Sequence, residues 1–549
     1  MKTSSYFLAF LIAVTYLAFN ISVISYSHFD EDAYILYRYA DMFNKGYGIT
    51  YYPNASPIEG ATDFLWLIMI IGISKLGFDI GTSAIILNSV GVFLVTLFLS
   101  NVLSKFNVVS DKIIFGSIAV FWLLFYPTMA ALGGFSVLLY CGLFIIPLYY
   151  IDHRKNLQFI PLFSILLGLF RPDGVLLGTG LATISLYYIY SEKRNNIKKI
   201  FFINSFIAII IGIVYFFWRY QYFGNILPLP LYVKQTGGAI VNLKNNIHNS
   251  LFYKHFFIYV FIIIALSIFY KKYTSKKILL LFPAFLLYIF LSVSHQSQNI
   301  GFRFQATIII SMVYVISSIV ASIKIENKHK NYILYLIPIL FLMAGLKTIN
   351  ELFYRFNKKP NLEISIPEFT SEFSKKLLKG NETIALTEAG FFSFFQTKNN
   401  KLIDLVGLNT PFTAKNKLDQ KYYSSINPDV IYYMRPNKMS PEKFNKKLYK
   451  KVNTVSEFKN SYNLNEIWEH AKFSKVPLAT QQSIIYLSNN WDKYDVYFLR
   501  YRKDPSRISE YTFAIKKDLK ISSNFEKLLD SLRPNSKSLS YYNLIYEQQ

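Results

Sequence analysis

Three consecutive acidic residues, Asp30, Glu31 and Asp32, stand directly after the first strongly apolar segment of the chain. Apolar residues follow at helical spacing and Lys45-Gly46 is a helix stop signal, so a short amphipathic surface helix is expected with the acids at its start. A carboxylate there can take a proton from an attacking hydroxyl, and coupling between neighbouring carboxylates can raise the pKa of one of them. We therefore take these three acids as the candidate catalytic residues.

These acids also have other interpretations. The first turn of a helix favours acidic residues through capping and the macrodipole, which would explain one of the three without any function. The carboxylates could also coordinate a divalent cation, although such ions usually take more oxygen ligands than this loop guarantees. The sequence therefore leaves the use of a metal open and makes no cofactor certain.

A fourth carboxylate, Glu59, lies in a turn punctuated by proline and glycine between Tyr52 and Asp63. Thr62 or Asp63 is positioned to cap the apolar helix that is expected next. Glu59 is a supporting candidate for the site, and its alternative role is that of a solvated loop acid.

Cations interrupt or flank the apolar segments at several points. Arg171-Pro172-Asp173-Gly174 breaks an apolar stretch, Arg219 and Lys234 bracket an aromatic loop, and Arg303 begins another apolar segment. Charge at membrane depth is costly and indicates function, while arginine and lysine both suit phosphate. Together they predict a site for a lipid phosphate or pyrophosphate. The alternatives are a simple turn pairing Arg171 with Asp173, and interfacial anchoring by each of the others.

The elements that must position these residues are membrane helices. The first two thirds of the chain repeat apolar runs of a length that can cross a hydrocarbon core, and such runs must be helical because lipid offers their backbone no hydrogen bonds. The apolar stretch of the first run is longer than the usual apolar region of a signal peptide, and Lys2 is the one basic residue before it, so we expect it to be retained. The runs are Tyr6–Ser27, Phe64–Ile80, Ala84–Ser104, Ile113–Ala130, Phe135–Ile151, Leu157–Phe170, Val175–Tyr190, Ile200–Trp218, Phe256–Tyr270, Ile278–Val293, Phe304–Ile323 and Tyr332–Leu346.

The formal net charge of +25 would suggest nucleic acid in a soluble protein. Here the basic residues gather in short loops, at 193–199, 271–277 and 324–330, which is the positive-inside pattern, and nucleic-acid binding is the weaker interpretation. With those loops in the cytoplasm, loops 28–63, 219–255 and 294–303 and everything after about residue 350 lie outside. One apolar segment between 63 and 171 must then fail to cross, and Leu157–Phe170 is the shortest. The single cysteine, Cys141, excludes an internal disulfide framework.

The expected fold is an all-α polytopic membrane domain of roughly 10–12 helical segments, residues 1–350, followed by a soluble extracytoplasmic α/β domain, residues 351–549. The second part is polar, with strand-length apolar runs at Thr383–Leu386, Leu402–Val406 and Val430–Tyr433. The whole chain is therefore predicted to be a multi-pass membrane protein.

Between about residues 28 and 435 the chain resembles the GT-C polytopic glycosyltransferases, in particular the branch containing the mycobacterial terminal β-arabinofuranosyltransferases. Six short motifs that occur in family order carry the resemblance, and residues 436–549 lie outside it. The motifs are Glu-Asp-Ala-Tyr-Ile…Arg-Tyr-Ala, Gly-Tyr-Gly, Glu-Gly-Ala-Thr-Asp-Phe-Leu-Trp, Arg-Pro-Asp-Gly, Tyr-Phe-Gly…Leu-Pro…Tyr-Val-Lys, and Thr387-Glu-Ala-Gly with Ile403-Asp-Leu-Val-Gly-Leu-Asn.

The resemblance implies transfer of a sugar from a polyprenyl-phosphate donor to a cell-envelope glycan acceptor outside the cytoplasmic membrane, with the acidic pair of the first outer loop as the catalytic centre. The partners would be this donor, a cell-surface glycan and membrane lipid, without nucleic acid. Single displacement would invert the anomeric configuration. The implied site comprises catalytic Glu31, Asp32 and Asp30, phosphate-binding Arg171, Lys234, Arg303 and Arg219, and supporting Asp173, Glu59 and Arg38.

Two positions depart from the family pattern. Relatives usually have Asp-Asp where this chain has Glu31-Asp32, so either the longer side chain does the same work or Asp30 supplies the shorter one. In Gly133-Gly-Phe-Ser136, Phe135 stands where an acid is expected. Two other classes of function also stay open. A transporter or flippase of a lipid-linked sugar would use the same cations without a base, and a non-catalytic scaffold would tolerate changes to the acids.

Overall fold

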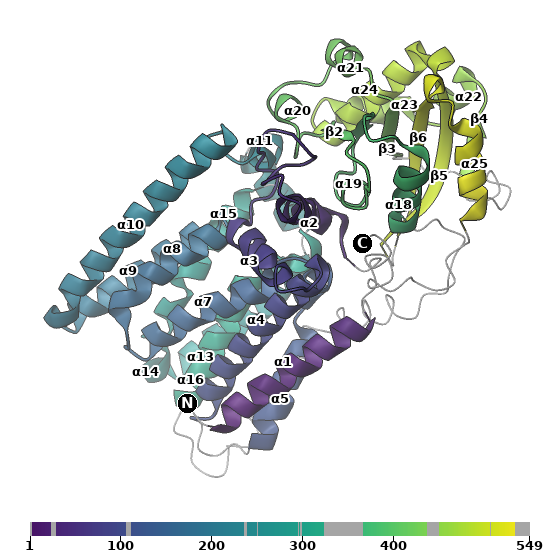
Figure 1. Ribbon diagram of the computed structural model, residues 1–549. Helices are drawn as coiled ribbons and strands as arrows, with labels where there is room; N and C mark the ends of the chain where they lie inside the picture. Colours follow the sequence, from purple (N-terminus) through teal and green to yellow (C-terminus); the bar gives the residue numbers. More distant parts are fainter. Residues whose placement is uncertain are drawn as a thin grey trace. The chain divides into compact units, whose positions relative to one another are not determined.

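The computed structural model describes residues 3–23, 29–105, 111–234, 239–249, 251–294, 296, 299–322, 366–435, 449–504 and 507–532 (Figure 1). The predicted helix Tyr332–Leu346 lies outside these residues. The chain forms two compact units that interleave along the sequence. Unit 1 comprises Met1–Val23, Asp63–Trp218 and Gly237–Phe353, and unit 2 comprises Ile24–Thr62, Arg219–Thr236 and Tyr354–Gln549.

The regular elements of unit 1 in its described residues are all helices. One expected segment, Ile113–Ala130, is broken at Pro127, which has no N–H to continue a helix, into α5 and α6. The elements are α1 (Thr3–Val23), α3 (Phe64–Ser74), α4 (Ile80–Leu103), α5 (Asp111–Leu124), α6 (Thr128–Leu132), α7 (Val137–Asp152), η2 (Leu157–Phe159), α8 (Ile160–Phe170), α9 (Gly174–Ser191), α10 (Asn195–Phe223, ending in unit 2), α12 (Ala239–Asn249), α13 (Leu251–Phe269), α14 (Lys271–Thr274), η3 (Ile278–Leu281), α15 (Phe282–Val293), η4 (Ile300–Phe302) and α16 (Ala306–Ser322).

Four helices in the described part of the chain are long and apolar enough to cross a membrane: Thr3–Ser22, Ile80–Leu103, Gly174–Ser191 and Asn195–Phe223. These helices differ in how much of their apolar surface the protein covers. In α4, 78% of the apolar window is buried inside the protein, whereas in α10 the share is 11%. We infer that α4 is central and that α10 presents its apolar side chains to lipid.

Helix α4 packs closely against α7. A Cβ added at Gly91 would lie 2.1 Å from the backbone carbon of Leu138, so only glycine permits this approach. Asn88 on α4 donates to the carbonyl of Phe135 at 2.9 Å and accepts from the backbone N–H of Leu138 at 3.1 Å. These bonds satisfy groups at the start of α7 that would otherwise be unpaired, and they fix the Phe135–Ser136 turn.

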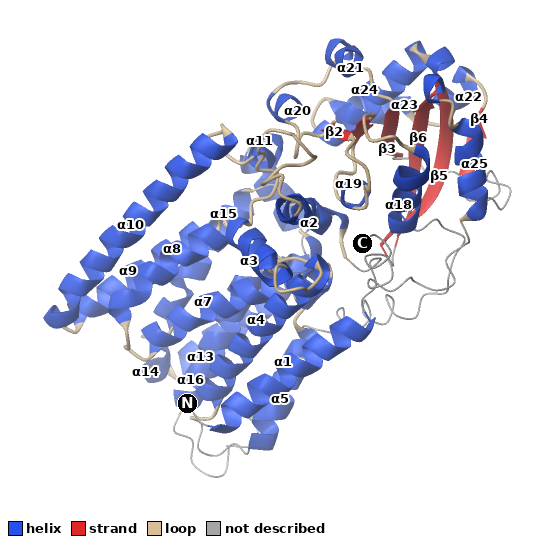
Figure 2. Cartoon of the chain, viewed as in Figure 1, coloured by secondary structure: helices blue, strands red, loops and turns tan. Residues whose placement is uncertain are grey.

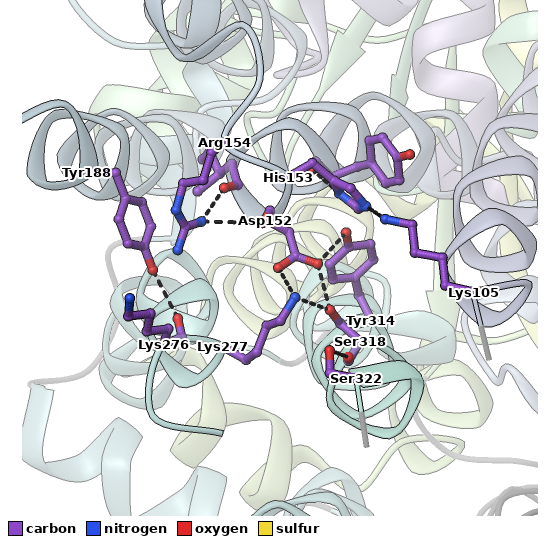
Figure 3. Close-up of polar contacts among 12 residues, drawn as sticks. Lys105, Asp152, His153, Arg154, Tyr188, Lys276, Lys277, Tyr314, Ser318 and Ser322 are labelled. Carbon is purple, nitrogen blue, oxygen red and sulfur yellow. Dashed lines mark hydrogen bonds and ion pairs between the residues drawn. The ribbon is translucent and has the colours of Figure 1, made fainter. Parts of the chain in front are cut away.

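A polar cluster ties the helix ends of unit 1 together (Figure 3). Asp152, at the end of α7, pairs with Lys277 and accepts hydroxyl hydrogen bonds from Ser318 at 2.6 Å and Tyr314 at 3.1 Å. Arg154 pairs with Glu192 at 3.0 Å, and the Tyr188 hydroxyl donates to the Lys276 carbonyl at 2.9 Å. The loops around 152–155, 192–199 and 271–277 therefore meet at one end of the unit.

In unit 2 a six-stranded sheet follows the helix α18, and all three predicted strands form (Figure 2). Its order is β2-β1-β3-β6-β5-β4, with β1 parallel to β2 and β3 and the other pairs antiparallel. The elements are α2 (Glu31–Asn44), α11 (Leu229–Lys234), α18 (Ile366–Leu377), β1 (Thr383–Leu386), α19 (Phe391–Phe394), β2 (Lys401–Asp404), α20 (Pro411–Lys415), α21 (Gln420–Ile426), β3 (Val430–Arg435), β4 (Tyr449–Val452), α22 (Val455–Asn460), α23 (Leu464–Ala471), α24 (Lys475–Asn489), η6 (Trp491–Lys493), β5 (Tyr494–Asp504), β6 (Arg507–Lys516), η7 (Lys517–Leu519) and α25 (Ser522–Ser531).

Both faces of this sheet are covered, as the alternation of strand side chains shows. On one face Phe513 of β6 contacts Phe373 of α18 and Phe525 of α25, each with ring centroids 5.0 Å apart. On the other face Tyr433 of β3 shares a 2.8 Å hydroxyl hydrogen bond with Tyr462. Unit 2 thus has a helix–sheet–helix core, as expected for an α/β domain.

A buried ion pair joins β3 to β6. Arg435 lies 3.2 Å from Glu510, with the two side chains 0% and 1% exposed, and its guanidinium stands 3.8 Å from the centroid of the Phe498 ring. Arg435 also donates to the carbonyl of Ser461 at 2.8 Å.

Replacing Glu510 by alanine should destabilise this sheet strongly, because it leaves the Arg435 charge buried without its partner. We expect a loss of about 3–5 kcal/mol, measured by hydrogen exchange of the β3 and β6 amides in the full-length protein. The exposed Glu469, paired with the exposed Lys472, is the matched control, and Glu469→Ala should change protection by less than about 0.5 kcal/mol. Equal protection in both variants would contradict this account.

Candidate active site

The acidic residues stand at the start of α2, as predicted. Asp30 is the N-cap residue, and Glu31 and Asp32 occupy the first turn, where negative charge is favoured. The helix is not a surface helix, however, because every residue from Ala33 to Ala40 is buried. Consecutive helical residues point about 100° apart, so this run leaves no side of the middle of α2 in solvent.

Helix α2 packs on the segment that follows β1. The ring of Tyr34 lies 4.6, 5.1 and 5.4 Å from those of Phe391, Phe394 and Phe395. The backbone N–H of Gly390 donates to the Glu31 carboxylate. A Cβ at Gly390 would lie 1.8 Å from the Glu31 carbonyl oxygen, so this contact requires glycine.

A second set of contacts comes from the segment that follows β2. The buried Asp404 carboxylate accepts four N–H hydrogen bonds, including those from the backbone N–H (2.9 Å) and side-chain amide (3.0 Å) of Asn409. Burial raises the pKa of Asp404, and these donors oppose the rise. Because the Asn409 amide nitrogen donates to Asp404, its oxygen is left to accept the Tyr39 hydroxyl of α2 at 2.7 Å.

The rest of the first outer loop (residues 28–63, called the first loop below) is held by buried contacts. The Tyr51 hydroxyl donates to the Ala389 carbonyl at 2.7 Å, and Arg38 donates to the Tyr51 carbonyl at 3.0 Å. Burial lowers the pKa of Arg38, while nearby Asp41 at 3.4 Å favours its charged form. Arg38 therefore supports the site by fixing the loop behind α2.

Two predicted residues, Glu59 and Arg219, form a buried ion pair at 2.6 Å, with each side chain 6% exposed. Burial raises the pKa of Glu59, and Arg219 opposes the rise. Arg219 also donates to the carbonyl of Ile226 at 2.7 Å, so it joins the first loop to the segment between α10 and α11. A phosphate that binds to Arg219, as predicted, would therefore compete with the Glu59 carboxylate for the guanidinium.

In unit 1 two of the predicted phosphate ligands share an aromatic ring. Arg171 and Arg303 have their guanidinium carbons 5.4 and 5.0 Å from the centroid of Phe304. Arg171 also pairs with Asp173 at 3.0 Å, the turn pairing that the sequence allowed. Arg303 lies 3.9 Å from the centroid of Phe135, the position where the resemblance led us to expect an acid. An aromatic face can attract a cation as an acid would, without a second charge.

From the sequence, Asp63 is expected only to cap a helix. It is the N-cap residue of α3, but it makes no capping side-chain bond and instead accepts the hydroxyl of Ser136 at 2.6 Å. It is also near enough to Arg171 for an electrostatic interaction. Asp63 is the last residue of the motif Glu-Gly-Ala-Thr-Asp, and this position in a resemblance motif could have indicated a role in the site.

The predicted residues divide between the two units. Unit 2 contains Asp30, Glu31, Asp32, Arg38, Glu59, Arg219 and Lys234, and unit 1 contains Arg171, Asp173 and Arg303. Lys234 ends α11, and its side chain lies outside the described residues. Among the residues that the structure describes, no three His, Cys, Asp or Glu side chains are arranged to hold a metal ion.

Residues 361–496, less than half of the chain, match a family model described as a domain of unknown function (DUF8728). No curated protein matches the sequence.

Two solved structures of ArnT from Cupriavidus metallidurans resemble the chain at 10% sequence identity. The one bound to undecaprenyl phosphate has a TM-score of 0.47 and the apo one 0.45, covering 81% of this chain and 94% and 95% of those chains. TM-scores below 0.5 do not establish a shared fold, so nothing about the activity of this chain follows from these likenesses.

Substituting Gly390 by alanine should displace the first turn of α2, since the added methyl group overlaps the Glu31 carbonyl. We expect α2 to open more easily by about 1–3 kcal/mol, read as faster hydrogen exchange in residues 31–44. Gly72→Ala is the control, because a Cβ there meets nothing within 4 Å. Exchange in α2 that is unaffected by Gly390→Ala would show that this contact does not hold the helix.

Proposed function

We propose that this protein is a membrane glycosyltransferase of the GT-C type. It moves a sugar from a polyprenyl-phosphate donor to a cell-envelope glycan acceptor on the outer side of the cytoplasmic membrane, where the soluble domain also lies. The observation that carries the proposal is the meeting of the resemblance motifs around the acids of α2. Tyr39 and Asn409, 370 residues apart, are directly hydrogen bonded, and Glu31 meets Gly390 in the same unit.

The reaction we propose is a single displacement. The Asp32 carboxylate accepts the proton of the acceptor hydroxyl as its oxygen bonds to the anomeric carbon. The bond from that carbon to the phosphate oxygen breaks, and the polyprenyl phosphate leaves as an anion that needs no general acid. Attack opposite the leaving group inverts the anomeric configuration.

The charge of the phosphate would be balanced by arginines of unit 1. Arg171 and Arg303 are buried and lie against the same Phe304 ring, which supports a shared role in holding an anion. Arginine matches a phosphate bidentately, and in a site shielded from water its attraction is stronger than at an exposed surface. Lys234 stays a proposed ligand of the same phosphate, and Arg219, paired with Glu59, stays one that would have to share its charge.

The glycan acceptor would be held by aromatic side chains of unit 2. Phe412 is 40% exposed and stacks on Tyr422, with ring centroids 3.8 Å apart and planes 10° apart. Such a rigid aromatic surface offers a flat apolar face at low entropic cost, which suits a carbohydrate ring.

A transporter or flippase of lipid-linked sugars is the alternative from another class. It would use the same arginines but would need no base. Turnover separates the two, because a transporter leaves the donor bond intact.

The direct test is sugar transfer by membranes that contain the overexpressed protein, given labelled polyprenyl-phosphate sugars and native envelope glycan. Asp32→Asn should lower kcat by about 100-fold or more, because a general base contributes about 10²–10⁴. Asp518→Asn, at an exposed position in η7, is the matched control and should transfer like the wild type. Full transfer by Asp32→Asn would refute the base, and intact donor in the presence of flipping would favour the transporter.

Replacing Arg171 by lysine keeps one charge but removes the fork that grips a phosphate. We expect the donor KM to rise by about tenfold, measured from initial rates at varied donor concentration. The acceptor KM is the internal control and should stay within twofold, by the same argument that only phosphate contacts are lost. A rise in the acceptor KM alone would place Arg171 away from the donor.

A further inference from the structure

The sheet of unit 2 has a point at which strand order reverses. The strand β1 lies between β2 and β3, parallel to both, and the chain runs from β1 to β2 on one side and then to β3 on the other. In open α/β sheets the ligand usually binds at such a switch point, beyond the carboxyl ends of the strands.

Here the segments that follow β1 and β2 are in contact with another part of the same chain, the first outer loop (residues 28–63). Beyond β1, Ala389 accepts the Tyr51 hydroxyl and Gly390 donates to Glu31. Beyond β2, Asn409 accepts the Tyr39 hydroxyl. The first loop therefore binds to the sheet domain where another α/β domain would bind a ligand.

The two acids of the pair cannot share this contact. Neighbouring residues on a helix point about 100° apart, so a Glu31 side chain that reaches Gly390 sends Asp32 in another direction. The Glu31 carboxylate is already a hydrogen-bond acceptor for a backbone N–H of the sheet domain. This bond holds the Glu31 carboxylate against the sheet domain, on a different side of the helix from Asp32.

We propose that Glu31 is a positioning residue, which fastens the start of α2 to Gly390, and that Asp32 alone takes the acceptor proton. This division of roles rests on the proposed function. It also gives a reason for the glutamate that replaces the aspartate expected from the resemblance: the additional methylene lets the carboxylate reach the backbone of the sheet domain.

The two roles predict opposite orders of activity for two substitutions. Glu31→Gln keeps the length and a carbonyl oxygen that accepts the Gly390 N–H, whereas Glu31→Asp keeps the charge but loses the reach. For a positioning residue, kcat should fall by less than about tenfold in Glu31→Gln and by more than that in Glu31→Asp, since one hydrogen bond to a charged group is worth about tenfold. In the same assay Asp32→Asn should lower kcat by about 100-fold or more. Near-complete loss in Glu31→Gln with activity kept in Glu31→Asp would make Glu31 the base and overturn the proposal.

Hydrogen exchange of residues 387–395 provides a readout that does not depend on transfer. These amides should stay protected in Glu31→Gln and exchange about tenfold faster in Glu31→Asp, because only the second variant loses the bond to Gly390. Glu469→Asp, which shortens an exposed glutamate of α23, is the control for shortening alone and should leave these amides unchanged.

The two readouts separate the two proposals. If the wild type transfers no sugar from any donor but exchange rises only in Glu31→Asp, the positioning contact stands and the glycosyltransferase proposal fails. If the amides of both Glu31 variants exchange like those of the wild type, Glu31 does not fasten α2, and the positioning role is overturned even if transfer is observed.

Discussion

The buried hydrogen-bond chain from Asp404 through Asn409 to Tyr39 is the constraint on which the acidic end of α2 depends. A buried carboxylate must find donors, and Asp404 takes the amide nitrogen of Asn409 as one of them. That choice fixes the amide, so its oxygen faces α2 and accepts the Tyr39 hydroxyl. Gly60 completes the contact, because a side chain there would overlap both Asn409 and Tyr39. Gly60 and the segment 404–409 are therefore both needed to place α2.

In unit 1, too, buried charged side chains have partners, but these are of other kinds. Asp152 is satisfied by Lys277, Ser318 and Tyr314, so a charge among apolar helices is not left unpaired. Arg303 instead lies over Phe135 and Phe304. An aromatic face attracts a guanidinium without adding a second charge.

The sequence predicted the features that local pattern determines. Apolar length gave the apolar helices of unit 1 that the structure describes but not α12, which lies in the predicted loop 219–255. Short apolar runs gave β1, β2 and β3, and the spacing after Asp32 gave α2. It did not predict β4, β5 and β6. Strand β6 pairs with β3, and β4 with β5, across long stretches of the chain, whereas β5 and β6 form a hairpin. The Glu59–Arg219 pair and the Glu31–Gly390 contact were missed for the same reason: the two partners lie far apart in the sequence, and no local pattern links them. The resemblance placed Glu31 and Gly390 in motifs but did not indicate that these two residues are in contact.

The central claim is that the first loop and the sheet domain hold each other through these buried bonds. The most direct measurement is a double-mutant cycle of Tyr39→Phe and Asn409→Ala in the full-length protein, read from hydrogen exchange of the α2 amides. The account predicts a coupling of about 1 kcal/mol between the two substitutions. Effects on α2 that add independently, to within about 0.3 kcal/mol, would contradict it.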